Sequence, residues 1–165
     1  MSSVSAVFYT AAHRIEGQVD LRERLSEALN DPLTAFVEMA DAKISSLSNR
    51  EASEVAWPLA TIPKETVLVA TLDLGEHESL QTRMDKGTRK SGSQVGAIVD
   101  SIEIYGTAHL IFEGSAHRVL TSQLGAFFPV TDATIILSQR SDHNRIHTQL
   151  ALVNRDKIRA FTLPK

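Results

Sequence analysis

Cysteine is absent from this 165-residue sequence, and aromatic residues are scarce. Without cysteine the chain has no disulfide, no thiolate metal ligand and no thiol nucleophile. A reducing compartment is compatible with that composition. Only 5% of the residues are aromatic, and Trp57 is the single tryptophan. We expect Trp57 to lie in the core, with an anchor at a protein interface as the alternative.

Long apolar runs are also missing. No stretch approaches the roughly 18 apolar residues that a membrane-spanning helix requires. The opening MSSVSAVFYTAAHR lacks the basic start and apolar run of a signal peptide. We therefore expect a soluble, cytoplasmic protein without membrane contact. The formal net charge of −3 gives no overall attraction to phosphate backbones, so nucleic acid would need a local basic patch.

What the sequence does contain is an internal repeat. PVTDATI at 129–135 resembles EMADAKI, which lies 91 residues earlier. At the same offset, LATIPKETVLVATL at 59–72 lies over LALVNRDKIRAFTL at 150–163. Upstream, RIEGQVDL at 14–21 matches EIYGTAHL at 103–110 when the offset falls to 89. Because apolar pattern, turn residues and spacing agree together, the sequence indicates a duplication.

Each copy predicts a strand, a short helix and three further strands. Apolar and polar residues alternate around Gly17 and around Gly106, as in half-buried strands. A glycine inside a strand indicates a bulge or a close backbone contact. The predicted fold class is mainly β (α+β), with two tandem β-α-β-β-β repeats packed as a pseudo-twofold pair of small antiparallel sheets or barrels.

The repeats are expected at 13–73 and 102–165, joined by a linker at 74–101. Residues 86–96 of this linker combine three glycines and two serines with basic residues, which favours a mobile loop. The candidate binding residues of the linker are Arg83, Lys86, Arg89 and Lys90. They would contact phosphates or an acidic partner, and a simply solvated loop is the alternative.

Two family resemblances rest on these motifs. The succession of RIEG, a short helix, FFPVTDATI and LVNRDKI resembles a group of small bacterial domains to which no activity is assigned, and covers most of each repeat. AFFPVTDATI and VNRDKIRAF are also similar, more distantly, to the two signature segments of Sm-like β-barrels. That second resemblance implies an RNA contact at Arg155 and Asn154. The sequence departs from it, because the glycine after the signature arginine is missing and the helix follows the first strand.

Asp41 and Asp132 occupy equivalent positions of the two copies. A carboxylate in each half could form a paired acid/base or binding site across a pseudo-twofold axis. The structural interpretation is that each aspartate accepts a backbone N–H two residues onward and so braces a bulge or turn. We favour the structural interpretation.

His143 and His147, with Asp142 beside the first, have a spacing that would bring metal ligands together on a helix. The segment is predicted to pass from loop into strand, where this spacing separates the side chains. No nucleophile elbow, Walker loop or dinucleotide fingerprint is present. We therefore predict no catalytic residues and no cofactor, and keep His143 and His147 as a weak alternative for metal.

Three hypotheses about function follow. The leading one is a non-enzymatic protein-binding or adaptor module of the bacterial type, which engages another protein through its sheet edges or the groove between the repeats. The second is an Sm-like nucleic-acid-binding protein, and the third is a metal-dependent hydrolase around His143, His147 and Asp132. A homo-oligomer is kept as an alternative to a partner protein.

Overall fold

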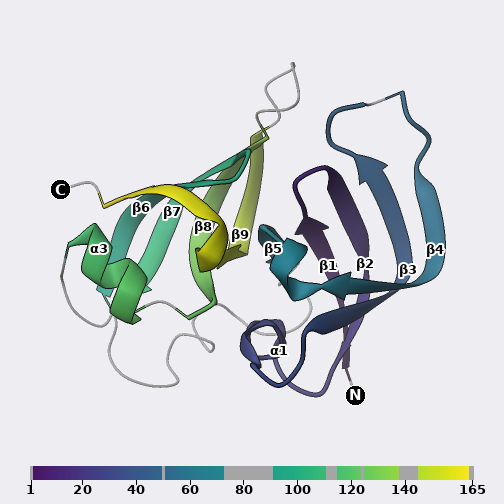
Figure 1. The fold of residues 1–165 in the computed structure, drawn as a ribbon, viewed down its shortest axis with the longest axis horizontal. Coiled ribbons are helices and arrows are strands. Elements are labelled where there is room, and N and C mark those ends of the chain that lie inside the picture. Colours follow the sequence, from purple (N-terminus) through teal and green to yellow (C-terminus); the bar gives the residue numbers. More distant parts are fainter. Residues whose placement is uncertain are drawn as a thin grey trace.

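The computed structural model places ten antiparallel strands in a single sheet, with only short helical segments beside it (Figure 1). It describes residues 2–49, 51–72, 91–110, 115–123, 125–137 and 145–163. The expectation of a mainly β protein is therefore confirmed. Among the residues that the structure describes, no helix is both long and apolar enough to cross a membrane.

The first half of the chain supplies five strands. Its elements are β1 (Ser2–Tyr9), β2 (His13–Leu21), α1 (Leu25–Asn30), β3 (Phe36–Ser46), β4 (Val55–Pro63), the 3₁₀ turn η1 (Lys64–Thr66) and β5 (Val69–Leu72).

The second half has the same order of elements. They are β6 (Ser91–Val99), β7 (Ile102–Leu110), α3 (Ala116–Arg118), the π-helical turn η2 (Val119–Gln123), β8 (Phe127–Leu137), β9 (Arg145–Asn154), the 3₁₀ turn η3 (Arg155–Lys157) and β10 (Ile158–Thr162).

The structure contains two strands that the sequence did not predict. The predicted β-α-β-β-β unit omits β1 and β6, which open each half. Residues 91–96 were expected in a mobile loop but form most of β6 instead, because they pair with β7 along their whole length. Residues 74–90 of the predicted linker lie outside the described residues.

The strands follow the order β10-β6-β7-β8-β9-β5-β1-β2-β3-β4 across the sheet. The two halves therefore lie side by side and meet where β5 pairs with β9 (Figure 1). We call the β5·β9 contact the junction. The junction pairs β5 of the first half with β9 of the second half, which are not equivalent to each other. The pseudo-twofold packing of the halves stays a prediction.

Strand registers agree between the halves. Phe36 of β3 faces Pro63 of β4, and Phe127 of β8 faces Asn154 of β9, each 91 residues further on. The β2·β3 register shifts between Glu16 and Gln18, and the β7·β8 register shifts at the equivalent point, between Tyr105 and Thr107. Each register shift lies at a glycine, Gly17 in β2 and Gly106 in β7.

Gly17 and Gly106 are needed for close backbone contact, as the sequence predicted. A Cβ atom on Gly17 would lie 2.6 Å from the carbonyl oxygen of Ala40, and one on Gly106 would lie 2.8 Å from that of Thr131. Both distances are shorter than a side-chain carbon tolerates. Each glycine therefore lets its strand bend tightly across the neighbouring one.

The apolar side chains form two clusters, one for each half. The first core contains Phe8, Leu25, Leu29, Met39, Val67 and Ala70, among others. The second core contains Ile102, Ile104, Val119, Phe128, Ile135 and Val153, among others. The junction mixes the two, because Phe127, Leu150 and Leu152 come from the second half and pack in the first core.

Candidate functional site

The sheet ends at β4 on one side and at β10 on the other. β4 pairs with β3 along its length, and no described strand lies on its other side. Figure 1 shows β4 at the far end of the row of strands that begins with β6. Unpaired backbone groups on such an edge are a template for another strand.

Large apolar side chains cluster on this edge. Trp57 and Leu59 of β4 are 51% and 55% exposed, Val55 is 46% exposed, and Phe36 at the start of β3 is 56% exposed. We call these four residues the β4 patch. The prediction that Trp57 lies in the core was wrong, because the outer side of β4 has no described strand to cover it. Several large apolar side chains exposed along one edge of a sheet are typical of an interaction surface.

The equivalent strand of the second half is covered instead. Leu150 and Phe127 take the places of Leu59 and Phe36, and each is only 4% exposed. They are buried because β5 lies against β9 and brings the first core onto them. Two equivalent strands of the chain thus differ in exposure. The outer side of β9 is covered by β5, and the outer side of β4 is not covered by any described strand.

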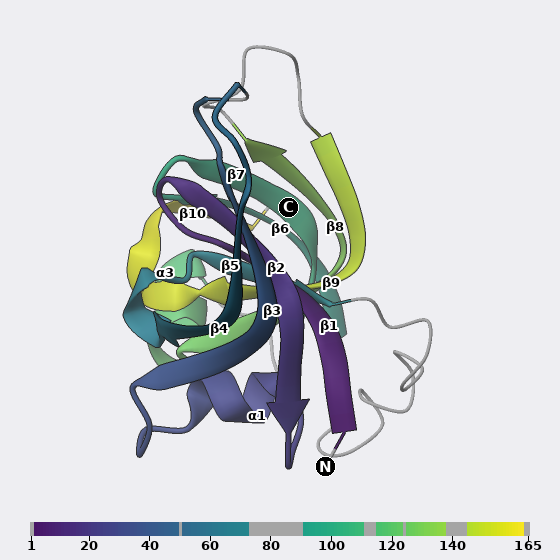
Figure 2. The same cartoon turned by 90° about the vertical axis from the view of Figure 1, so that its right-hand side faces the viewer.

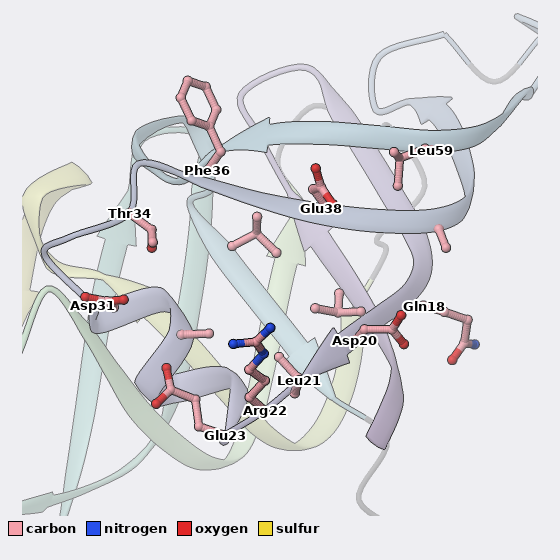
Figure 3. A pocket seen from close by; sticks show the side chains of 14 residues that line it. Gln18, Asp20, Leu21, Arg22, Glu23, Asp31, Thr34, Phe36, Glu38 and Leu59 are labelled. Atoms are coloured by element: carbon pink, nitrogen blue, oxygen red, sulfur yellow. The ribbon is translucent and has the colours of Figure 1, made fainter. Parts of the chain in front are cut away.

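A hollow of about 360 Å³ adjoins the β4 patch. It is lined by residues of β2, α1 and β3, with Phe36 and Leu59 contributing from the patch. Figure 3 shows Asp20, Glu23 and Asp31 around the hollow, with Arg22 among them. The rim therefore carries more acidic than basic side chains.

Lys64 holds the loop beside this hollow. Its side chain is buried, and Nζ donates to the carbonyl oxygen of Asp31 (3.0 Å) and to Oγ1 of Thr34. The backbone N–H of Lys64 donates to the carbonyl oxygen of Ala35 at 2.9 Å. The loop between α1 and β3 is thereby tied to the end of β4, which fixes the position of Phe36.

Asp41 and Asp132 are exposed residues with positive φ, 50° and 47°. Within the described residues neither carboxylate accepts a hydrogen bond, so the predicted brace to a backbone N–H is not formed. Aspartate tolerates the left-handed conformation better than most side chains. Asp132 lines a small hollow with His147, Thr148 and Gln149, and Asp41 takes no part in it. The structure does not bring the two aspartates into one site.

Asn154 and Arg155 are engaged in contacts within the chain. Asn154 is buried, its Nδ2 donates to the carbonyl oxygen of Val67 at 2.9 Å, and its Oδ1 accepts from the N–H of Asp156. Arg155 Nε lies 3.6 Å from a carboxylate oxygen of Asp156. The Asn154 amide thus links β9 to the start of β5, a role that the sequence did not predict.

The remaining predicted residues are described in part. His147 is exposed on β9 and its Nδ1 lies 3.1 Å from Oγ1 of Thr134. No cluster of three metal-binding side chains occurs in the part of the chain that the structure describes. His143 and the four linker bases Arg83, Lys86, Arg89 and Lys90 lie outside that part.

Comparisons of this chain with protein-family models, with curated proteins and with solved structures give no match. Both family resemblances therefore stay predictions, and the function has to be argued from the molecule itself.

Proposed function

We propose that this chain is a non-enzymatic protein-binding module that adds an extended segment of a partner protein to the open side of β4. The observation that carries the proposal is the β4 patch beside a strand edge that no described strand pairs with. In strand addition, main-chain hydrogen bonds supply affinity and alternate side chains supply specificity. Trp57 is well suited to such a contact, because tryptophan is enriched among residues that dominate binding energy.

We infer further that the module arose by duplication. The matching strand order, registers and glycine contacts of the two halves support this inference. Duplication gives the patch a physical explanation: each unit has a β4-type strand whose outer side needs a cover. In the second unit β5 supplies the cover, and in the first unit a partner does.

The prolines of β4 restrict how a partner segment can pair. Pro58 and Pro63 have no N–H, so each removes one donor from the strand. Proline on an edge strand protects against indiscriminate pairing. Pro63 takes the place of Asn154, whose N–H donates to Leu68 across the junction at 2.9 Å. A partner on β4 therefore gains less from hydrogen bonds at this end and more from the apolar patch.

Photo-crosslinking in cells tests the proposal. A photoreactive residue at position 55 should give covalent adducts whose partner is identified by mass spectrometry. The matched control carries the same residue at position 5, because Ser5 is exposed on β1, which already has strands on both sides. Adducts at position 55 and none at position 5 are expected. The absence of adducts at both positions, or equal yields at both, would overturn the proposal.

A further inference from the structure

We propose that the strand that docks on β4 is β10 of a second copy of this chain, so that copies join head to tail. This inference rests on the proposed function and specifies its partner. It is carried by the junction, where the chain already makes the same kind of contact within itself. There the β5-type strand of one half pairs with the β4-type strand of the other.

The two open edges are equivalent to the two strands of the junction. β5 pairs with β1 through Ala70 and Phe8, and β10 pairs with β6 through Phe161 and Ala97, each one the equivalent residue of the other half. β4 and β9 are equivalent through their pairing with β3 and β8. β10 therefore takes the position of β5 in its half, and β4 takes that of β9, although the β10·β6 register shifts between Ile158 and Ala160.

The register of the contact follows from that equivalence. At the junction Val69 pairs with Val153, Ala70 with Leu152 and Thr71 with Ala151. Shifted by 91 residues in each strand, this gives Ala160 opposite Ile62, Phe161 opposite Thr61 and Thr162 opposite Ala60, with the strands in different copies.

Side-chain sizes in the proposed register are complementary. At the junction the small Ala70 faces the large Leu152, and both are buried. Between copies the large Phe161 would face the small Thr61. At this central pair the order of sizes is reversed, so Ala70 with Leu152 and Phe161 with Thr61 each combine one small and one large side chain. Interdigitation of this kind lets a contact reach the packing density of a core.

Each open edge is incompletely covered in the single chain. Val67, which precedes β5, and Ala70 of β5 are fully buried in the first core. Their equivalents Ile158 and Phe161 are only partly buried against the second core. On the other edge, Phe36 and Leu59 are exposed where Phe127 and Leu150 are buried. Docking β10 on β4 would cover both sets together.

The contact between copies has fewer polar links than the junction. Asn30 Nδ2 donates to the carbonyl oxygen of Phe127 and Oδ1 accepts its N–H, both at 2.8 Å. The equivalent residue of the second half is Thr121, whose hydroxyl donates to the carbonyl oxygen of His117. Pro63 replaces Asn154, and Arg159 replaces the buried Leu68. We therefore expect copies to associate reversibly.

Each copy has one β4 edge and one β10 edge, which makes the interface head to tail. Such an interface closes into a ring if the rotation between copies allows it, and otherwise grows as an open chain. Both outcomes differ from a symmetric dimer, in which β4 would pair with β4. That difference allows a direct test with variants of the full chain.

Two variants block one edge each. Leu59→Asp places a carboxylate in the β4 patch, and Ala160→Asp places one on β10, where the equivalent Val69 is fully buried at the junction. Leu59 and Ala160 are both exposed in the single chain, so the fold tolerates either change. The control Ser5→Asp is exposed and lies on neither edge.

Mass measured by light scattering over a range of protein concentrations gives the result. The parent chain and Ser5→Asp should exceed the mass of one chain, with a mass that falls on dilution. Leu59→Asp and Ala160→Asp should each have the mass of one chain. Mixed in equal amounts they should form a species of two chains, because one variant retains β10 and the other retains β4.

Other outcomes overturn the inference. A mixture that stays at the mass of one chain contradicts it, and so does a parent chain of that mass at its highest soluble concentration. If Ala160→Asp still associates by itself, the contact is symmetric. Adducts at position 55 to a different protein, with a parent chain that stays single, reject this inference and leave the proposed function standing. If position 55 also gives no adducts, both are rejected.

Discussion

β4 and β9 differ in one neighbour. Both strands pair with an equivalent strand in the same register, and both have a leucine at the equivalent position, Leu59 and Leu150. β9 has β5 on its outer side, and Leu150 is 4% exposed; β4 has no described strand there, and Leu59 is 55% exposed. The same residue in the same local structure is thus core in one half and surface in the other. Whether this leucine is buried therefore depends on the strand that lies next to its own in the sheet, and not on the sequence of its own strand.

The largest effect expected from this comparison concerns the two phenylalanines. Phe127→Ala should lower the free energy of unfolding by about 3–5 kcal/mol, because the ring is buried at the junction. Phe36→Ala should change it by no more than about 0.5 kcal/mol at protein concentrations where the chain is single, because that ring is exposed. Urea unfolding of both variants measures the difference. Equal losses would show that the two positions are not a covered and an uncovered form of one edge.

The two glycine contacts were the part of the fold that the sequence predicted best. Gly17 and Gly106 indicated close backbone contacts, and the structure places a carbonyl oxygen against each one. Such signals are local, because they depend on backbone geometry and on residues a few positions apart.

β1 and β6 were missed because their stability does not come from their own residues. SSVSAVFY and SGSQVGAIV are rich in serine, alanine and glycine, which give little sign of a strand. Each strand has a partner on both sides, β2 and β5 for β1, and β7 and β10 for β6. Hydrogen bonds and packing from those partners outweigh weak propensity.

The candidate site was missed for a related reason. Trp57 was predicted to be buried, as an aromatic residue in an apolar strand usually is. Whether its outer side is covered depends on which strand ends the sheet, and the sequence of β4 does not contain that information. The predicted hydrogen bond from a backbone N–H to the carboxylates of Asp41 and Asp132 was also wrong. Both aspartates instead occupy positions with positive φ.

A smaller effect is expected at these two aspartates. Asp41→Ala and Asp132→Ala should each lower stability by about 1 kcal/mol, because alanine adopts the left-handed conformation less readily than aspartate. Glycine at either position should stay within about 0.5 kcal/mol of the parent chain, because it has no Cβ to strain. Thermal melts of the four variants compare the halves directly. Unchanged melting temperatures for both alanine variants would remove the backbone explanation and restore a binding or catalytic role.

The smallest effect concerns one pair of surface positions that the halves fill differently. In β2, Arg14 lies 2.9 Å from Glu16 as an ion pair. The equivalent positions of β7 hold Glu103 and Tyr105, and the Tyr105 hydroxyl donates to the Glu103 carboxylate at 3.2 Å. The negative charge of Glu103, and then this hydrogen bond, raise the pKa of Tyr105 above its ordinary value of 10.0. The first half has no tyrosine at either position.

A raised pKa in the folded state means that the folded chain holds the proton more tightly than the unfolded chain. The stabilisation from Tyr105 is therefore fully present below the ordinary tyrosine pKa and is lost as the pH rises through the raised one. Titration of phenolate absorbance should show the Tyr105 transition moving to lower pH in Glu103→Gln, because the amide keeps the position but not the charge. Arg14→Gln, the equivalent change in the first half, should leave that transition in place. Arg14→Gln makes the molecule more negative, so an effect of overall charge would move the Tyr105 transition to higher pH in that variant. A rise in Arg14→Gln as large as the fall in Glu103→Gln would contradict the local pair as the cause.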